Sequence, residues 1–132
     1  MGTGNWSLVR IRVAALELPE SMLKAFAGPR FGRAGLRALV DAPHRPLLGT
    51  AIKPVGFPTD KLAEFAYQFA LGGIDIVKED HGLLNQPTAP YAERVSACAE
   101  AVHRANQETG GRALYVPHIT GPADEIVERA LM

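Results

Sequence analysis

Several features that would assign this chain to a particular class of protein are absent from its 132 residues. There is one cysteine, so no disulfide can form within the chain, and we expect a protein of the reducing cytoplasm. Lysine and arginine total 14, which equals the 14 aspartates and glutamates, and this balance disfavours a nucleic-acid partner. Neither a long apolar run nor a charged-then-apolar leader is visible, so we expect no membrane segment and no secretion.

The most informative segment is residues 72–82, where two glycines lead into an apolar run that ends in charged side chains. This order is typical of a buried parallel strand that ends at the rim of an active site. Successive side chains of a strand alternate between its faces, so Lys78 and Asp80 are expected on one face and Glu79 on the other. An isolated pair of this kind is more often a surface ion pair, and only its context favours a functional site.

Two other segments have the same design. Residues 46–54 contain an apolar run followed by Lys53, and residues 112–121 contain one followed by His118. Helical patterns lie between these strands and after the last one, so the order β-α-β-α-β-α favours an α/β fold with a parallel sheet or a (β/α) barrel. The carboxyl ends of the three strands would then meet at one edge, which is where barrels hold their chemistry.

The helical patterns have their own start and stop signals. Thr59 is expected to cap the first helix, and glycines 72 and 73 are expected to end it. The apolar stripe of this helix consists of Leu62, Phe65, Ala66, Phe69 and Ala70. The stripe of the second helix, which is expected to open at residue 88 or 89 and to end near residue 110, consists of Val95, Cys98, Ala99, Val102 and Ala105. Cys98 is therefore predicted to be a buried, unreactive thiol.

The amino-terminal third is less regular. Residues 6–13 predict a possible strand, and short helices are expected near residues 19–26 and 33–40. A third full helix is predicted after Thr120, with Pro122 in its first turn.

Three motifs taken together resemble the RuBisCO large-chain superfamily: GPRFG at residues 28–32, LGTAIKP at 48–54 and GGIDIVKED at 72–80. The similarity in order and spacing covers most of the chain. It implies that residues 46–132 form the first three β/α units of a TIM (β/α)8 barrel, and that residues 1–45 are the end of the family's N-terminal domain. A whole barrel needs about 250 residues, so the chain is expected to be a fragment that is poorly stable and inactive alone.

The resemblance also implies roles for individual residues. Lys78 matches the lysine that CO2 converts to a carbamate, and this carbamate and Asp80 would bind Mg2+. The neighbouring family ligand is a glutamate, but here it is His81, which is expected either to bind the metal or to act as an acid or base. Lys53 matches a strand-end lysine that faces the carbon losing its proton. His118 is a further catalytic candidate, at or beside a position where the family commonly has asparagine.

Two departures from the carboxylase pattern favour the RuBisCO-like branch of the superfamily. Val55 stands where the carboxylases have a second lysine, and His81 replaces the glutamate ligand. The resemblance therefore implies an enzyme that enolises, isomerises or decarboxylates a phosphorylated keto-sugar or sugar acid, as a homodimer when complete. A divalent cation would stabilise the enolate. Because imidazole softens the ligand set, a cation other than Mg2+ is an alternative.

Each candidate residue also has a structural alternative. Lys53 could be a strand-end cation paired with a carboxylate, His81 a loop histidine bonded to the backbone, and His118 a packing histidine. For the chain as a whole, the alternatives are a fragment of a divergent ribulose bisphosphate carboxylase and a non-catalytic binding or truncated product.

Overall fold

The structure is a computed structural model that describes residues 12–132. The strand predicted over residues 6–13 lies, except for its last two residues, outside this range. The chain divides into two compact units, Met1–Arg30 and Phe31–Met132. The first unit contains the helix α1, Glu20–Ala25, which confirms the helix expected near residues 19–26.

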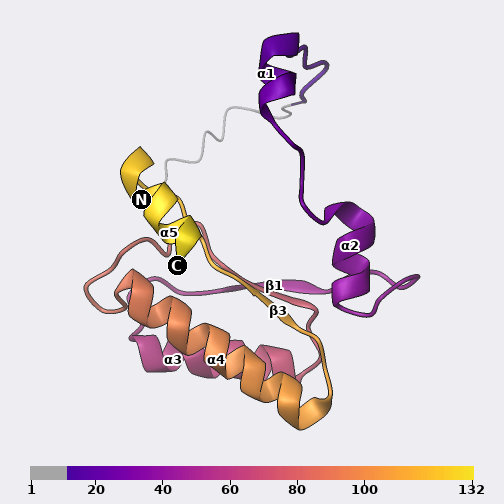
Figure 1. Ribbon diagram of the computed structural model, residues 1–132. Helices are drawn as coiled ribbons and strands as arrows, with labels where there is room; N and C mark the ends of the chain where they lie inside the picture. Colours follow the sequence, from indigo (N-terminus) through magenta and orange to yellow (C-terminus); the bar gives the residue numbers. More distant parts are fainter. Residues whose placement is uncertain (1–11) are drawn as a thin grey trace. The chain divides into compact units, whose positions relative to one another are not determined.

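The second unit has the predicted alternation of strands and helices. Its sheet is parallel, with the strands in the order β1-β2-β3. The elements in chain order are α2 (Gly32–Leu39), β1 (Gly49–Ile52), α3 (Thr59–Leu71), β2 (Ile76–Glu79), α4 (Tyr91–Thr109), β3 (Leu114–Val116) and α5 (Ala123–Leu131). α3 and α4 lie side by side along one face of the sheet (Figure 1). The α/β class with a three-stranded parallel sheet is therefore confirmed.

The core lies between the sheet and these two helices. It contains fully buried side chains of β1 and β2, such as Ile52 and Val77, packed against Leu62 of α3 and Cys98 of α4. In the register of the sheet Ala51 lies opposite Lys78, and Lys78 lies opposite Val116. The three strands therefore end at the same edge, as parallel pairing with helical crossover connections requires.

The predicted start of α3 is wrong by one residue. The N-cap is Pro58, which has an extended conformation and whose carbonyl accepts the N–H groups of Lys61 and Leu62. Thr59 is already inside the first turn, and its buried hydroxyl has no hydrogen-bond partner. The reason is that the helical hydrogen bonds of the first turn already reach Pro58, so that Thr59 is not at the cap position.

The predicted stripe of α4 is correct only in part. Cys98, Val102 and Ala105 are buried, but Ala99 is exposed and Val95 is only half-buried. Arg94 and Ala101 take the inner positions instead. The face of α4 that packs against the core therefore follows Arg94 at intervals of three and four residues. A stripe chosen by apolar character alone leaves this buried arginine out.

Many apolar side chains outside the core remain exposed, as expected for an open sheet. Val55 after β1 is 56% exposed and Val116 in β3 is 44% exposed. Within residues 12–132, no helix has the length and apolar character needed to cross a membrane.

Candidate active site

The carboxyl edge of the sheet brings together a lysine and an aspartate from neighbouring strands. Lys53 follows β1 directly and Asp80 follows β2 directly, and the pairing of the strands continues between them because the Asp80 N–H donates to the carbonyl of Ile52. Lys53 Nζ lies 3.4 Å from Asp80 Oδ2. The lysine side chain is 65% exposed and the aspartate 18%. An amine that solvent can reach is thus held beside a mostly covered carboxylate.

The Asp80 carboxylate is oriented by the turn that follows β2. Its Oδ1 accepts the Gly82 N–H at 3.0 Å, and its carbonyl accepts the Leu83 N–H at 2.9 Å. Short polar side chains commonly brace turns in this way. The Gly82 hydrogen bond, followed by that with Lys53, lowers the pKa of Asp80 against the opposing effect of desolvation. Asp80 is therefore an anion at neutral pH.

His81 and Lys78 lie next to this pair in the chain but are held less tightly. His81 Nδ1 is 3.6 Å from Asp80 Oδ1, and the imidazole is 89% exposed. Lys78 is exposed, and its Nζ donates to the carbonyl of Glu79 at 2.7 Å. Within residues 12–132 Lys78 forms no ion pair with a carboxylate, so its amine contacts the backbone and not an acidic side chain.

His118 reaches the same edge from β3, where it follows Pro117. It is half-buried, and its backbone N–H donates to Glu79 Oε2 at 2.9 Å. Within the described part of the chain, no hydrogen bond or ion pair joins the His118 imidazole to Lys53 or Asp80. The structure therefore brings Lys53, Asp80 and His81 into contact, and it leaves His118 in the neighbouring loop.

The loops that follow β1 and β2 are held to each other beside this site. The Gly56 N–H donates to Gln86 Oε1 at 3.1 Å. A Cβ atom at Gly82 would lie 3.2 Å from Val55 Cγ2 and 3.3 Å from Asp80 Oδ1, so a glycine at this position allows the two loops to approach closely. This approach helps to keep Lys53 near Asp80.

The donors present are only part of a metal site. In residues 12–132, no group of three or more His, Cys, Asp or Glu side chains is placed to hold a metal ion. Asp80 and His81 provide one carboxylate and one imidazole. A carbamate on Lys78 would add two oxygens on the face of β2 that also carries Asp80. With that modification, the chemistry of the donors fits a divalent cation such as Mg2+.

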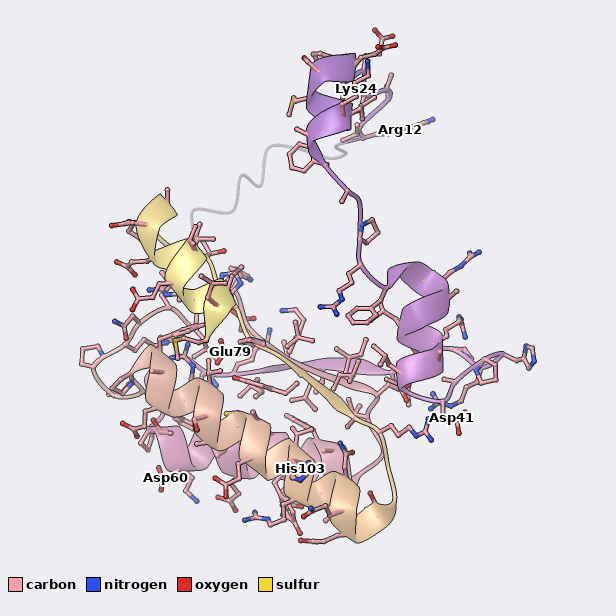
Figure 2. The ribbon with its side chains drawn as sticks, in the orientation of Figure 1. Arg12, Lys24, Asp41, Asp60, Glu79 and His103 are labelled. Carbon is pink, nitrogen blue, oxygen red and sulfur yellow. The ribbon has the colours of Figure 1, made fainter. Side chains whose placement is uncertain are left out.

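Sequence reasoning assigned no role to Glu79 and Arg94, which form a buried ion pair behind the site. Glu79, which is labelled in Figure 2, is 2% exposed, and Arg94 is fully buried. The side-chain alternation along β2 correctly predicted that Glu79 faces away from Asp80. A carboxylate that faces the core needs a buried cation as its partner. A search of the helical stripes for such a cation could have identified Arg94.

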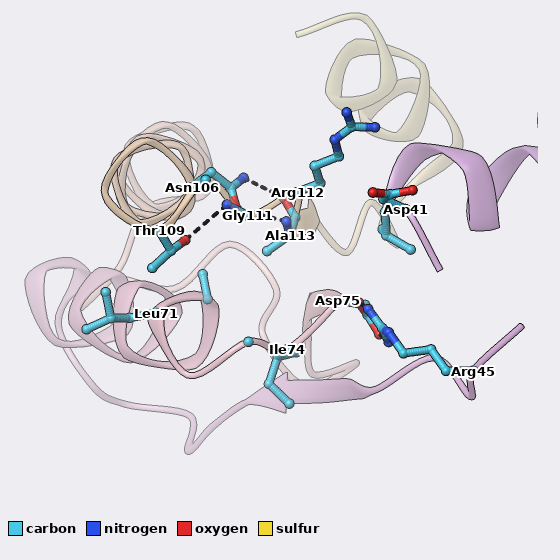
Figure 3. A pocket seen from close by; sticks show the side chains of 14 residues that line it. Asp41, Arg45, Leu71, Ile74, Asp75, Asn106, Thr109, Gly111, Arg112 and Ala113 are labelled. Atoms are coloured by element: carbon cyan, nitrogen blue, oxygen red, sulfur yellow. Dashed lines mark hydrogen bonds and ion pairs between the residues drawn. The ribbon is translucent and has the colours of Figure 1, made fainter. Parts of the chain in front are cut away.

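A pocket of about 380 Å3 opens at the other end of the sheet from these residues, and Figure 3 shows its lining. Most of its polar groups already pair with one another. Arg45 makes two hydrogen bonds of 2.6 Å to Asp75, and Asn106 exchanges two with the backbone of Ala113. Its hydrogen-bonding capacity is largely used within the protein, so it is not a candidate active site.

Comparison with known proteins relates the fold and the site to one family. The match to the ribulose bisphosphate carboxylase large chain, catalytic domain, covers residues 33–131. A 5-methylthioribulose-1-phosphate isomerase from Rhodospirillum rubrum is 46% identical over 125 residues, which are 93% of this chain and 33% of that protein. The chain therefore spans about a third of the length of this relative.

Solved structures agree with the sequence comparison. The RuBisCO-like protein of Rhodopseudomonas palustris matches 86% of this chain and 33% of its own, at 48% identity and a TM-score of 0.80. A dimeric archaeal RuBisCO from Hyperthermus butylicus matches 86% of this chain and 27% of its own, at 32% identity and a TM-score of 0.76.

Proposed function

Because the chain belongs to the ribulose bisphosphate carboxylase large-chain family, we propose that it is part of a RuBisCO-like enzyme that stabilises the enolate of a phosphorylated keto-sugar or sugar acid. The observation that carries this proposal is the distance of 3.4 Å between Lys53 Nζ and Asp80 Oδ2 at the ends of adjacent strands. This contact supports a role for the Lys53 amine in proton transfer and for the neighbouring Asp80 carboxylate in binding a cation. The isomerase from Rhodospirillum rubrum supports isomerisation of a phosphorylated ketose as the reaction.

The proposal includes a larger fold. Three consecutive parallel strands, with α3 and α4 on one face, are the arrangement that begins a TIM barrel, and we assign residues 46–132 to the first three units of such a barrel. Residues 1–45 would then be the end of a preceding domain. The proposed activity belongs to the whole protein, because this chain spans only about a third of the length of the isomerase that it resembles.

The cofactors in this proposal are Mg2+, or another divalent cation, and CO2 as a carbamate on Lys78. The carbamate, Asp80 and His81 would hold the cation, which supplies positive charge to the oxygens of the enolate when bound. Two observations on Lys78 support the carbamate: solvent, and with it CO2, can reach the exposed side chain, and within the described residues no carboxylate occupies its amine.

The residues of the chain itself have distinct parts in this scheme. Lys53 would exchange a proton with the substrate carbon, and Asp80 keeps its amine at the strand end. His81, which is 89% exposed, is open to a substrate oxygen as an acid or base if it is not a ligand. His118 is the second candidate for proton transfer from the adjoining loop.

The proposed partners are a phosphorylated sugar as substrate and a second copy of the whole protein. The archaeal RuBisCO from Hyperthermus butylicus is dimeric, which supports a homodimer. A divergent ribulose bisphosphate carboxylase is the second candidate function, and its support is the likeness to that same structure. His81 and Val55 count against it, because they replace the charged groups that the carboxylases use.

Calorimetric titration of the 132-residue chain with Mg2+, with and without bicarbonate, tests the cation site. We expect bicarbonate to strengthen binding in the wild type and to have no effect in Lys78→Arg, whose guanidinium forms no carbamate. Asp80→Asn should lose binding, and Asp60→Asn, in the first turn of α3, should retain it. Binding that does not respond to bicarbonate would contradict the carbamate.

Two further measurements separate the roles within the site. His81→Glu restores the carboxylate that the family usually has, and it should tighten cation binding if His81 is a ligand. An unchanged affinity would remove His81 from the ligand set. Incubation of the chain with a phosphorylated ketose and Mg2+ should give no turnover, because the other barrel units are needed. Turnover above background would show that these 132 residues suffice.

A further inference from the structure

The carboxylate of Glu79 is the centre of a buried hydrogen-bond network behind the candidate site. Its Oε1 accepts Arg94 Nε at 2.5 Å and the Tyr115 hydroxyl at 2.7 Å. Its Oε2 accepts the His118 backbone N–H at 2.9 Å and Arg94 Nη2 at 3.3 Å. An ionised carboxylate offers about four lone-pair sites, so its capacity is used in full.

Arg94 is equally well satisfied and adds a second loop to the network. Its Nη1 donates to the carbonyls of Leu84 and Ala89, at 3.0 and 2.7 Å, and its Nη2 also donates to that of Leu83 at 3.2 Å. Together with the two bonds to Glu79, all five guanidinium N–H groups have acceptors. The pair therefore joins α4 and the loop after β2 to the loop after β3.

The hydrogen bond from the His118 N–H to Glu79 holds the loop that follows β3. Pro117 has no N–H, so His118 carries the first backbone donor beyond β3. Within residues 117–121, all of which the structure describes, His118 is the only residue whose backbone N–H donates a hydrogen bond. The conformation of this loop at its histidine thus depends on one buried carboxylate, which comes from the strand that also carries Asp80.

We propose that Glu79 is a positioning residue. By accepting the His118 N–H, its carboxylate fixes the place of His118 at the carboxyl edge of the sheet, and Arg94 is the counter-ion of Glu79. The part of His118 in proton transfer rests on the proposed function, but its placement by Glu79 does not. The alternation of side chains separates the two tasks of β2. Lys78 and Asp80 face the substrate side, and Glu79 faces the core and orders the neighbouring loop.

Amide hydrogen exchange in the 132-residue chain, followed by NMR, tests the assignment. In the wild type, the His118 amide should exchange at least about tenfold more slowly than that of Thr120, which donates no hydrogen bond. Because Glu79→Met alone would leave the Arg94 charge buried, the test variant is the double change Glu79→Met and Arg94→Met. We expect the His118 amide to lose its protection there and its ring 1H–13C signal to shift.

The matched control removes a different ion pair of the β2 region, by Asp75→Met and Arg45→Met. That pair lies at the opposite end of the sheet, with Asp75 5% exposed, so the control should leave the His118 signals in place. Tyr115→Phe, which removes one bond to the same carboxylate, should also leave them in place. An unprotected His118 amide in the wild type, unchanged protection in the test variant, or equal loss in the control would each overturn the proposal.

The same proteins distinguish this inference from the proposed function. Bicarbonate-dependent Mg2+ binding should be within about twofold of wild type in both double variants, because Lys78 and Asp80 are on the other face of the strand. If the wild type shows no such binding while its His118 protection depends on Glu79, the proposed function fails and the positioning role remains. If the wild type binds Mg2+ in this way but its His118 amide is unprotected, the positioning role of Glu79 fails and the proposed function remains.

Discussion

Replacement of Arg94 by methionine is expected to destabilise the protein strongly. Methionine has a similar length and can still pack near the Tyr91 ring, whose centroid is 5.6 Å from the Arg94 guanidinium carbon. It donates no hydrogen bond, so Glu79 would remain as a buried charge without its counter-ion, and three backbone carbonyls would lose a donor. Breaking one side of a buried pair costs about 3–5 kcal/mol.

This free energy can be measured as a shift in urea unfolding, followed by far-UV circular dichroism. With a slope of about 2 kcal/mol/M, the loss corresponds to a midpoint lower by about 1.5–2.5 M. The matched control is Arg45→Met, because the Arg45 side chain is 50% exposed in its pair with Asp75. Because solvent screens that pair, the control should shift the midpoint much less. A shift below about 0.5 M for Arg94→Met, or equal shifts for the two variants, would refute the reasoning.

Three further predictions concern the core, the carboxylates and the thiol. Leu62→Ala removes a fully buried side chain and should lower the free energy of unfolding by about 2–5 kcal/mol. The control Leu71→Ala, at the end of the same helix, removes a side chain that is 38% exposed and should lower it by less than about 1 kcal/mol. Urea unfolding of both variants measures the difference. The hydrogen bond from Arg45 lowers the pKa of Asp75, and that from Gly82 lowers the pKa of Asp80. Their stabilisation is therefore complete above the ordinary value of 3.8 and is lost as the pH falls through the lower folded pKa, so the urea midpoint should stay constant from pH 7 to about 5 and decline below about 4. Burial raises the pKa of the Cys98 thiol to about 11, so a maleimide should modify it at pH 8 only as fast as the protein unfolds; rapid labelling without denaturant would contradict this.

The elements of the second unit could be predicted from the sequence because their signals are local. An apolar run that ends in a lysine or histidine, followed by a helical stripe and glycines, recurs along the chain, and the strands and helices form where these patterns lie. The side-chain alternation of β2 also correctly separated Asp80 from Glu79. The predicted roles of Lys53, Lys78, His81 and His118 have not been tested and remain proposals.

The two errors have different causes: one residue's place depends on a partner distant in the chain, and the other error is a shift of one residue at the start of a helix. Arg94 was left out of the stripe of α4 because an arginine is usually exposed, and only Glu79, 15 residues earlier, makes its burial favourable. Thr59 was expected at the cap because threonine favours that position, but the hydrogen bonds of α3 begin at Pro58.

The amino-acid sequence alone determined the order of strands and helices, the edge at which charged side chains gather, and the likeness to one family. The strands and helices follow from side-chain periods of two residues in strands and of three to four residues in helices, and the likeness follows from three short motifs. Only the tertiary structure decided that Lys53 meets Asp80, and that Glu79 binds Arg94, Tyr115 and the backbone of His118. The hydrogen bonds and ion pairs of buried groups depend on distances of a few ångströms between separate elements, and those distances exist only after the chain has folded.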